Sequence, residues 1–420
     1  MNRFVGHGRS EVTVAEEMTP VEAHLDAILA LLPSADPIEL RIADALGLVL
    51  AHDVTCHVTV PAFPNSAMDG FAVVAADIAE ARVDGPVELP VIGEIGAGAA
   101  ELPSLARGQA VRIMTGAPLP PGADTVVPVE LTSSERREQV AVHRALERGS
   151  NVRRPGEDLT PGQPLIAAGR RLSPADIGLL AAAGTTRVTC VPPPRVVIMS
   201  TGDELVRAEH EPGPGQIRDT NGPMLSALVR ATGAVPFSAG IVGDDRKALM
   251  YTFDTNLGHA DLFVCTGGAS AGTRDLLPDV IGAMGDVESV KVAMKPGMPQ
   301  IRGRIGRVPV IGLPGNPVSA FVSFEVFVRP AVRHMQGRRD RERPSVVARA
   351  LEPLESPPHK RSYLRVRLSR EDGAWQARST GAQGSHVISS IAQADGLAVV
   401  PEDVTEVRPG EQVRVYLLVD

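Results

Sequence analysis

The sequence predicts a multidomain α/β protein with a doubly wound α/β domain, a β-rich insert, a mixed N-terminal domain and a small C-terminal β-barrel. Three observations predict this fold class. The chain has 420 residues, more than one hydrophobic core usually supports. Residues 195–334 alternate strand-like and helix-like segments. Residues 59–151 and 345–420 carry short apolar runs separated by turn signals.

The mixed N-terminal domain is predicted from two separate segments of the chain. Residues 19–50 are expected to form two helices, the first over PVEAHLDAILALL and the second starting at RIADALGLVLA. After the insert, Ser173 is the expected N-cap and Pro174 the first residue of a short apolar helix. Residues 1–17 are polar and carry no periodicity, so we expect a disordered leader there.

The doubly wound domain has the clearest pattern in the chain. Buried strands are expected at RVVIMS, PFSAGIV, DLFVCT, VKVAM and VPVIGL, and helices at NGPMLSALVRATG, DDRKALMYTFDTNL and PVSAFVSFEVFVRPAV. This alternation predicts a largely parallel sheet with helices on both faces. After residue 343 the helical pattern stops, and YLRVRLS, LAVVP and EQVRVYLLV predict the strands of a small β-barrel or sandwich.

These segments divide the chain into five predicted units. The run Pro192–Pro194 marks the boundary before the doubly wound domain. In chain order, the units are the leader (1–17), the mixed domain (18–58 with 152–190), the β-rich insert (59–151), the doubly wound domain (191–335) and the β-barrel (345–420).

Composition argues against several classes of protein. A formal net charge of -8 and 3% aromatic residues are unfavourable for general nucleic-acid binding. Cys56, Cys190 and Cys265 lack metal-ligand spacing, so we expect buried free thiols. No apolar run approaches the roughly 18 residues of a membrane span, and the N-terminus lacks a signal-peptide pattern. We therefore expect a cytoplasmic protein that binds neither nucleic acid nor membrane.

Polar, glycine-rich loops follow four of the predicted strands. Ligands of open α/β sheets bind at the carboxyl ends of the strands, so these loops should converge on one site. Glycines let the backbone approach a ligand, and the N–H groups exposed there favour an anion. The candidate binding residues are Thr201, Gly202, Gly267, Gly268, Ser270, Gly272, Pro314, Gly315 and Asn316.

Charged residues in these loops leave more than one interpretation open. Asp275 has the wrong charge for a phosphate, which suggests a bridging Mg²⁺ held with another carboxylate such as Asp244. The alternative for TGGASAG is a tight turn in which Asp275 caps the next helix. Asn316 and Pro317 make an ordinary helix start that also aims N–H groups at the cleft. Lys295 is either a point charge for an oxyanion or a solvated side chain.

Two clusters outside the sheet also carry charged side chains. PNSAMDGF places Asp69 in a turn of small residues, and RRPGED places Asp158 beside two arginines. Taken alone, each cluster is typical of a solvated turn.

Taken together, these segments resemble the molybdopterin molybdenumtransferase family, MoeA and the gephyrin E domain. The strings in the family's order are PNSAMDGFAV, RIMTGAPLPPGADTVV, RPGEDL, STGDEL, IRDTNGPML, TGGASAG, MKPGMP, GLPGNPVSAF and QGSHVISS. The resemblance covers nearly the whole chain after the leader. It implies a cytoplasmic homodimer of four subdomains, the third folded like a molybdopterin adenylyltransferase (MogA-like).

The resemblance also implies an activity and roles for particular residues. Family members take adenylylated molybdopterin and molybdate, cleave the pyrophosphate with a divalent metal such as Mg²⁺, release AMP and place molybdenum on the dithiolene. By motif match, the catalytic positions are Asp69, Thr115, Asp158, Glu204 and Asp275, and the metal-binding positions are Asp244 and Asp275. The molybdate-binding positions are Lys295, Ser319, Arg365 and Ser385. Asp69 and Thr115 are expected from the partner chain.

Two departures from the family pattern suggest an alternative. Met298 stands where a second lysine is usual, and Thr273 where an acidic residue is usual. A thioether cannot neutralise molybdate, so weaker molybdate binding is expected, with Arg274 and Arg302 as candidate replacements. The alternative is a gephyrin-like scaffold that holds a partner peptide between the third and fourth subdomains, with weakened or lost activity. Every carboxylate expected for catalysis is nevertheless present, which favours the enzyme.

Overall fold

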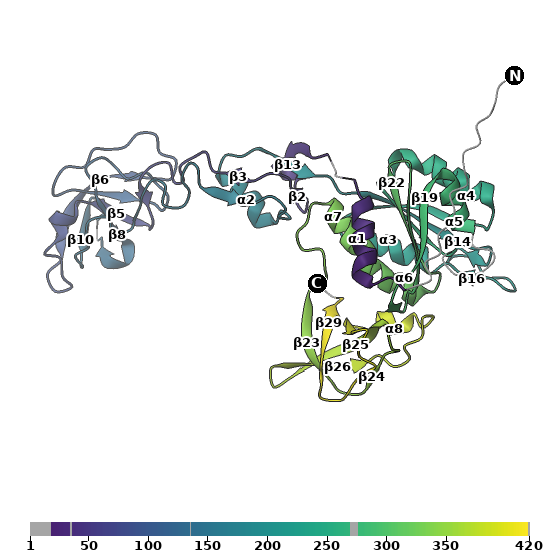
Figure 1. Ribbon diagram of the computed structural model, residues 1–420. Coiled ribbons are helices and arrows are strands. Elements are labelled where there is room, and N and C mark those ends of the chain that lie inside the picture. Colours follow the sequence, from purple (N-terminus) through teal and green to yellow (C-terminus); the bar gives the residue numbers. More distant parts are fainter. Residues whose placement is uncertain (1–17, 34–35, 135, 269–275, 419–420) are drawn as a thin grey trace, which may run out of the picture.

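The protein is elongated, and its elements form four groups spread along it (Figure 1). The computed structural model describes residues 18–33, 36–134, 136–268 and 276–418. A β-rich unit forms one end and an α/β unit the other, with a narrow connecting unit between them. The C-terminal barrel lies beside the α/β unit. The predicted multidomain architecture is confirmed.

The β-rich unit contains a six-stranded sheet in the order β8-β5-β7-β6-β10-β9. Its strands are β5 (Gly70–Val73), β6 (Val87–Ile95), β7 (Ala110–Ile113), β8 (Thr125–Pro128), β9 (Thr132–Ser133) and β10 (Gln139–Val142). Strand β4 (Asn65–Ser66) pairs antiparallel with β11 (Val152–Arg153), so the two ends of the insert meet. The β-rich insert expected from the sequence is confirmed.

The connecting unit is built from short antiparallel pairs. Its elements are β1 (Ile38–Arg41), β2 (Val49–Leu50), β3 (Val54–Thr55), β12 (Pro164–Ile166), α2 (Pro174–Ala182) and β13 (Arg187–Val191). The helix predicted at RIADALGLVLA is wrong, because this segment forms one 3₁₀ turn (Ile42–Asp44) and then β2. Gly47 adopts φ +79, which a continuing helix cannot accommodate. Pairing of β2 with β13 then buries both of its residues.

Helix α2 begins with the capping pattern that the sequence predicts. The Ser173 hydroxyl oxygen accepts a hydrogen bond from Asp176 N at 3.3 Å. The Asp176 carboxylate accepts one from Ser173 N at 2.8 Å. These reciprocal bonds satisfy backbone donors that the first turn of a helix leaves without helical partners. Ser173 is confirmed as the N-cap.

The α/β unit is a six-stranded sheet in the order β17-β14-β18-β22-β21-β19. Its strands are β14 (Arg195–Thr201), β17 (Val235–Val242), β18 (Leu262–Thr266), β19 (Gly285–Lys291), β21 (Pro299–Ile305) and β22 (Val308–Leu313). The first four strands in that order are parallel, and β21 and β19 extend the sheet antiparallel. The largely parallel sheet is confirmed, whereas β21 was not predicted.

Helices cover both faces of this sheet. Alternate residues of β14 enter two different hydrophobic clusters, Val196 and Ile198 on one face and Val197 and Met199 on the other. The helices are α3 (Asn221–Ala231), α4 (Arg246–Asn256), α5 (Leu276–Met284), α6 (Pro317–Ser323) and α7 (Arg329–Met335). A π-helical stretch (Phe324–Val328) joins α6 to α7. The doubly wound arrangement is therefore confirmed.

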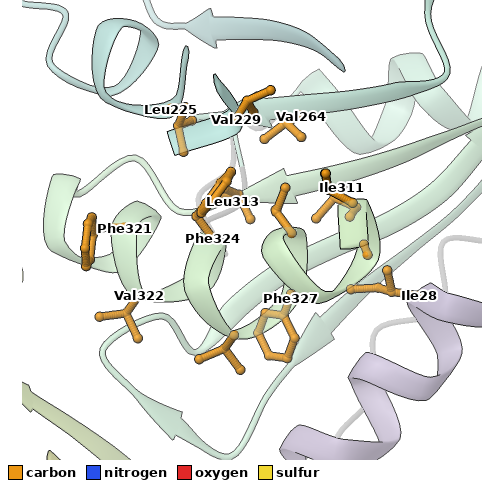
Figure 2. Close-up of a cluster of buried hydrophobic side chains, with 14 of the residues drawn as sticks. Ile28, Leu225, Val229, Val264, Ile311, Leu313, Phe321, Val322, Phe324 and Phe327 are labelled. Carbon is orange, nitrogen blue, oxygen red and sulfur yellow. The ribbon is translucent and has the colours of Figure 1, made fainter. Parts of the chain in front are cut away.

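Helix α1 (Val21–Leu31) also packs on the α/β unit, although we assign its segment to the mixed domain by sequence. Ile28 of α1 lies beside Phe327 in the cluster that contains α3 and α6 (Figure 2). Thr19 N donates to Lys291 O at 2.7 Å, which ties the start of α1 to the end of β19.

The C-terminal unit is a closed five-stranded barrel, because β25 pairs with both β26 and β27. Its strands are β23 (Ser345–Ala350), β25 (Arg361–Glu371), β26 (Ala374–Ser379), β27 (Gly396–Val400) and β29 (Gln412–Leu417). Smaller elements of the barrel unit are β24 (Leu354–Glu355), β28 (Glu406–Val407) and α8 (Ser389–Ala392), and those of the α/β unit are β15 (Leu205–Val206), β16 (Ile217–Arg218) and β20 (Met294–Lys295). The predicted barrel is confirmed.

Two expectations from composition can be compared with the structure. Cys56, Cys190 and Cys265 are buried free thiols, as predicted. Within the described ranges, no helix combines the length and apolar character needed to cross a membrane.

Candidate active site

A cavity of about 440 Å³ lies at the carboxyl ends of the central α/β strands. We call it the sheet-edge cavity. The sequence-predicted residues that line it are Thr201, Gly202, Glu204, Asp244, Gly267, Gly268, Pro314, Gly315 and Asn316. The loops that follow β14, β17, β18 and β22 therefore converge on one site, as expected from the sheet topology.

Close approach of two loops forms part of this cavity. Gly267 has φ +88, and a Cβ atom there would overlap the carbonyl oxygen of Thr201. The Thr201 hydroxyl donates to Thr266 O at 3.1 Å, which fixes the loop after β14 against the end of β18. A side chain at position 267 would push these loops apart, so glycine is required there for steric reasons.

Two carboxylates, Glu204 and Asp244, stand on the cavity wall. Asp203 Oδ1 accepts a hydrogen bond from Asp244 N at 2.9 Å, and so holds the loop after β17 against the loop after β14. Among the described residues, no group of three or more His, Cys, Asp or Glu could hold a metal by itself. Two carboxylates nevertheless suit Mg²⁺, which commonly takes its other ligands from substrate phosphates and water.

Two asparagines add polar groups to the sheet-edge cavity. Asn221, at the start of α3, donates from Nδ2 to Gly315 O at 2.7 Å. Its Oδ1 is buried and has no hydrogen-bond partner in the described part of the chain. Asn316 is the N-cap of α6, as predicted, but its side chain makes no capping bond. Asn221 was not assigned a role from the sequence, although it belongs to the string IRDTNGPML.

Three predicted site residues, Ser270, Gly272 and Asp275, lie outside the residues that the structure describes. The same holds for Thr273 and Arg274. Among the described carboxylates, Glu204 and Asp244 are those that line the sheet-edge cavity.

A second cavity, of about 540 Å³, lies between the α/β unit and the barrel. We call it the interdomain cavity. It brings together Lys295, Ser319 and Ser385, three of the four residues assigned to molybdate from the sequence. Pro299 lines both cavities, so the two adjoin each other.

Contacts between units shape the interdomain cavity. Strand β20 of the α/β unit pairs parallel with β25 of the barrel, with Lys295 opposite Ser362. Val318 N, in the first turn of α6, donates to Ser385 O at 3.1 Å. The cavity is therefore a junction between α6, β20 and a barrel loop, which no single segment of sequence could reveal.

Arg365, the fourth predicted molybdate-binding residue, does not line the interdomain cavity. Its side chain is fully buried, and this burial lowers its pKa to about 10. Its guanidinium donates to Ser390 Oγ at 3.1 Å and to Gly384 O at 3.3 Å. In this arrangement Arg365 supports the loop that carries Ser385 rather than facing the cavity.

Asp69 and Thr115 form a separate exposed pair in the β-rich unit. Asp69 Oδ1 accepts hydrogen bonds from the Thr115 backbone N–H at 2.7 Å and from its hydroxyl at 2.8 Å. These two bonds hold the pKa of the Asp69 carboxyl below its usual value. The carboxylate is thus kept ionised on an open surface.

The β-rich pair and Asp158 are not part of either cavity. Strand β5, which follows Asp69 directly, lies at the opposite end of the molecule from β14 and β22 (Figure 1). Asp158 is exposed where the chain leaves the β-rich unit, and its N–H donates to Val60 O at 3.0 Å. One chain therefore does not bring all the predicted catalytic residues together.

Three family models match consecutive parts of the chain. The MoeA N-terminal region (domain I and II) matches residues 19–184, and a probable molybdopterin binding domain matches residues 197–334. The MoeA C-terminal region (domain IV) matches residues 347–418. The matches thus include the β-rich unit, the α/β unit and the barrel.

Similar proteins cover almost the full length of the chain. It is 41% identical over 405 residues to molybdopterin molybdenumtransferase 2 of Mycobacterium tuberculosis, covering 95% of this chain and 99% of the relative. It is 35% identical over 387 residues to the molybdopterin molybdenumtransferase of Bacillus subtilis, covering 90% and 89%. A crystal structure of a molybdopterin biosynthesis MoeA protein from Pyrococcus horikoshii matches with a TM-score of 0.80 and 32% identity, covering 96% and 99%.

Proposed function

The chain belongs to the MoeA family of molybdopterin molybdenumtransferases, and from this premise we propose its reaction. It takes adenylylated molybdopterin and molybdate, cleaves the pyrophosphate bond, releases AMP and transfers molybdenum to the dithiolene. The observation that carries this proposal is the pair of adjoining cavities that share Pro299. One offers glycine loops and carboxylates, and the other offers a lysine and serines, so a nucleotide and an oxyanion can bind side by side.

The sheet-edge cavity supports binding of the adenylylated substrate. Backbone N–H groups at the glycine-rich loops are donors for phosphate oxygens, and Gly267 and Gly268 keep side chains away from them. The unpartnered Asn221 Oδ1 offers a buried acceptor to a polar group of the substrate. These groups would orient the pyrophosphate for attack by an oxygen nucleophile at phosphorus.

Mg²⁺ fits the sheet-edge cavity through Glu204 and Asp244. When bound there, it would supply Lewis-acid neutralisation of the phosphate oxygens. Asp203 keeps Asp244 in place through the 2.9 Å bond to its backbone N–H. The arrangement of the chain thus brings two negative groups to the same wall on which the pyrophosphate would lie.

Molybdate is proposed to enter the interdomain cavity as the second substrate. Lys295 contributes a positive charge and Ser319 and Ser385 contribute hydroxyl donors, which together suit a tetrahedral oxyanion. Since the cavities adjoin at Pro299, molybdate would be held next to the molybdopterin end of the nucleotide substrate.

We further propose that the active unit is a homodimer. Asp69 and Thr115 belong to the β-rich unit, which lies at the opposite end of the elongated chain from the α/β unit and its cavities (Figure 1). A second copy could place its own β-rich end over those cavities and so complete the site. This proposal explains why an ionised carboxylate is held on an exposed surface.

The test is AMP release from adenylylated molybdopterin by the purified protein, with Mg²⁺, across a molybdate titration. The parent is expected to release AMP in a molybdate-dependent reaction. Asp244→Asn should lower the rate by about 100-fold, as for loss of a group that stabilises transition-state charge. Asp254→Asn, which removes an exposed carboxylate from α4 of the same unit, is the matched control and should behave as the parent.

A folded parent that releases no AMP at any molybdate concentration would overturn the transferase proposal. It would favour the scaffold alternative, in which the interdomain cavity receives a partner peptide.

A further inference from the structure

The interdomain cavity contains a second cation that no sequence pattern indicated. Lys360, in the loop before β25, lines the cavity together with Lys295. Its Nζ donates to the Sδ atom of Met298 at 3.5 Å. The chain contains only four lysines among its 42 basic residues, counting Lys and Arg, and two of the four meet in this cavity.

The position of Lys360 is fixed by contacts on both sides of the cavity. Arg361 N donates to Ala293 O at 2.9 Å, next to β20. The Ser356 hydroxyl donates to Lys360 O at 3.2 Å and is also hydrogen-bonded to the Ser362 hydroxyl, with the two oxygens 2.8 Å apart, which closes the loop on itself. The half-buried Lys360 side chain therefore projects from an ordered loop toward the same space as Lys295.

Within the described part of the chain, no acidic side chain pairs with Lys360. Among the described residues no ion pair involves Lys360, and its side-chain hydrogen-bond partner is a thioether, which is a weak acceptor. The nearby carboxylates Glu402 and Glu22 are taken by Arg361 instead. A partly buried ammonium group without a counter-ion favours an anion from solution.

Arg302 does not replace the cation that is missing at position 298. Its guanidinium bonds Glu288 at 2.7 Å and His24 Nδ1 at 3.1 Å, and it does not line the interdomain cavity. Arg274 lies outside the described residues.

We propose that Lys360 is an oxyanion-binding residue, which acts with Lys295 as the second positive charge on a tetrahedral dianion in the interdomain cavity. This inference rests on the proposed function, in which that dianion is molybdate. Two ammonium groups match the two negative charges of molybdate, and Ser319 and Ser385 add neutral donors. Met298 serves as the uncharged surface against which the Lys360 ammonium lies.

The experiment measures binding of sodium molybdate to the full chain by isothermal titration calorimetry, and separately its half-saturating concentration in AMP release. Lys360→Met is expected to weaken molybdate binding by about tenfold, with the rate at saturating molybdate retained. Lys247→Met, which removes an exposed lysine from α4, should leave both values unchanged. The double variant Lys360→Met, Met298→Lys returns a cation to the same contact and should recover most of the affinity.

The outcomes separate this inference from the proposed function. Unchanged molybdate affinity in Lys360→Met, or a loss that the double variant does not recover, would overturn the role of Lys360 while leaving the transferase intact. A parent that binds molybdate but releases no AMP would overturn the proposed function, and calorimetry on Lys360→Met would still decide the role of Lys360. A parent that binds no molybdate would overturn the inference.

Discussion

The charge of Asp69 depends mainly on Thr115, and the nearby charge of Arg112 adds a smaller contribution. Both hydrogen bonds from Thr115 reach the same carboxylate oxygen, and both favour the ionised form over the protonated form. The pKa of Asp69 is therefore lowered. A carboxyl with a lowered pKa keeps its charge as pH falls through the usual range, and becomes neutral only at lower pH.

We predict that Thr115→Val shifts the acidic limb of the pH–rate profile for AMP release to higher pH. Valine removes the hydroxyl donor but keeps the backbone donor, so the pKa of Asp69 moves part of the way back toward its usual value. Thr115→Ser keeps both donors and is the matched control. An acidic limb that is identical in Thr115→Val and the parent would contradict a role for the ionised Asp69 in the rate.

Single residues differ in how well the sequence could predict them. The loops of the sheet-edge cavity were predictable because they follow parallel strands, which end at a common edge, whereas Asn221 at the start of α3 was not predicted. Lys360 was not predictable, because it stands 62 positions from Met298 and meets it only through packing of the barrel on the α/β unit. Arg365 matched a motif, but its burial depends on the barrel core, which a motif does not encode.

At the scale of elements, the capping box of α2 gives a quantitative prediction. Ser173→Ala removes the side-chain acceptor of the first turn and should lower the free energy of unfolding by about 1 kcal/mol. Thr220→Ala is the matched control, because Thr220 is the N-cap of α3 without a side-chain capping bond. Urea unfolding followed by circular dichroism compares the two. Equal losses in both variants would show that the capping bond contributes little.

The elements that the sequence mispredicted are those whose structure depends on distant partners. The segment RIADALGLVLA has a helix-like run of apolar residues, yet it becomes β2 because β13, more than a hundred residues later, supplies the pairing strand. Strand β21 was missed for a related reason. Its apolar residues are interrupted by Arg302 and Arg304, and it is recognised as a strand only by its pairing with β19 and β22.

At the scale of the whole molecule, the elongated shape separates residues that the motif match assigns to one active site. The α/β unit forms the sheet-edge cavity and shares the interdomain cavity with the barrel, whereas the Asp69–Thr115 pair belongs to the β-rich unit at the other end of the molecule (Figure 1). The strand and loop pattern predicted the cavity loops, and the motif match to the family gave Asp69 and Thr115. Neither could predict the distance between the Asp69–Thr115 pair and the cavities, because this distance depends on the narrow connecting unit that holds the β-rich unit away from the sheet.

In the proposed dimer, each site takes Asp69 from one subunit and Asp244 from the other, and this leads to a complementation prediction. Asp69→Asn alone and Asp244→Asn alone should each be nearly inactive in AMP release. If each site combines the β-rich end of one chain with the cavities of the other, a mixed dimer has one site carrying both substitutions and one site carrying neither. Unfolding the two variants together in equal amounts and refolding them should therefore restore about one quarter of the parent activity. About half of the dimers are mixed, and half of the sites in each mixed dimer are intact.

Refolding each variant separately is the control, and should restore none. No recovery in the mixture, with dimers present by light scattering, would show that each chain completes its own site and would exclude the shared arrangement.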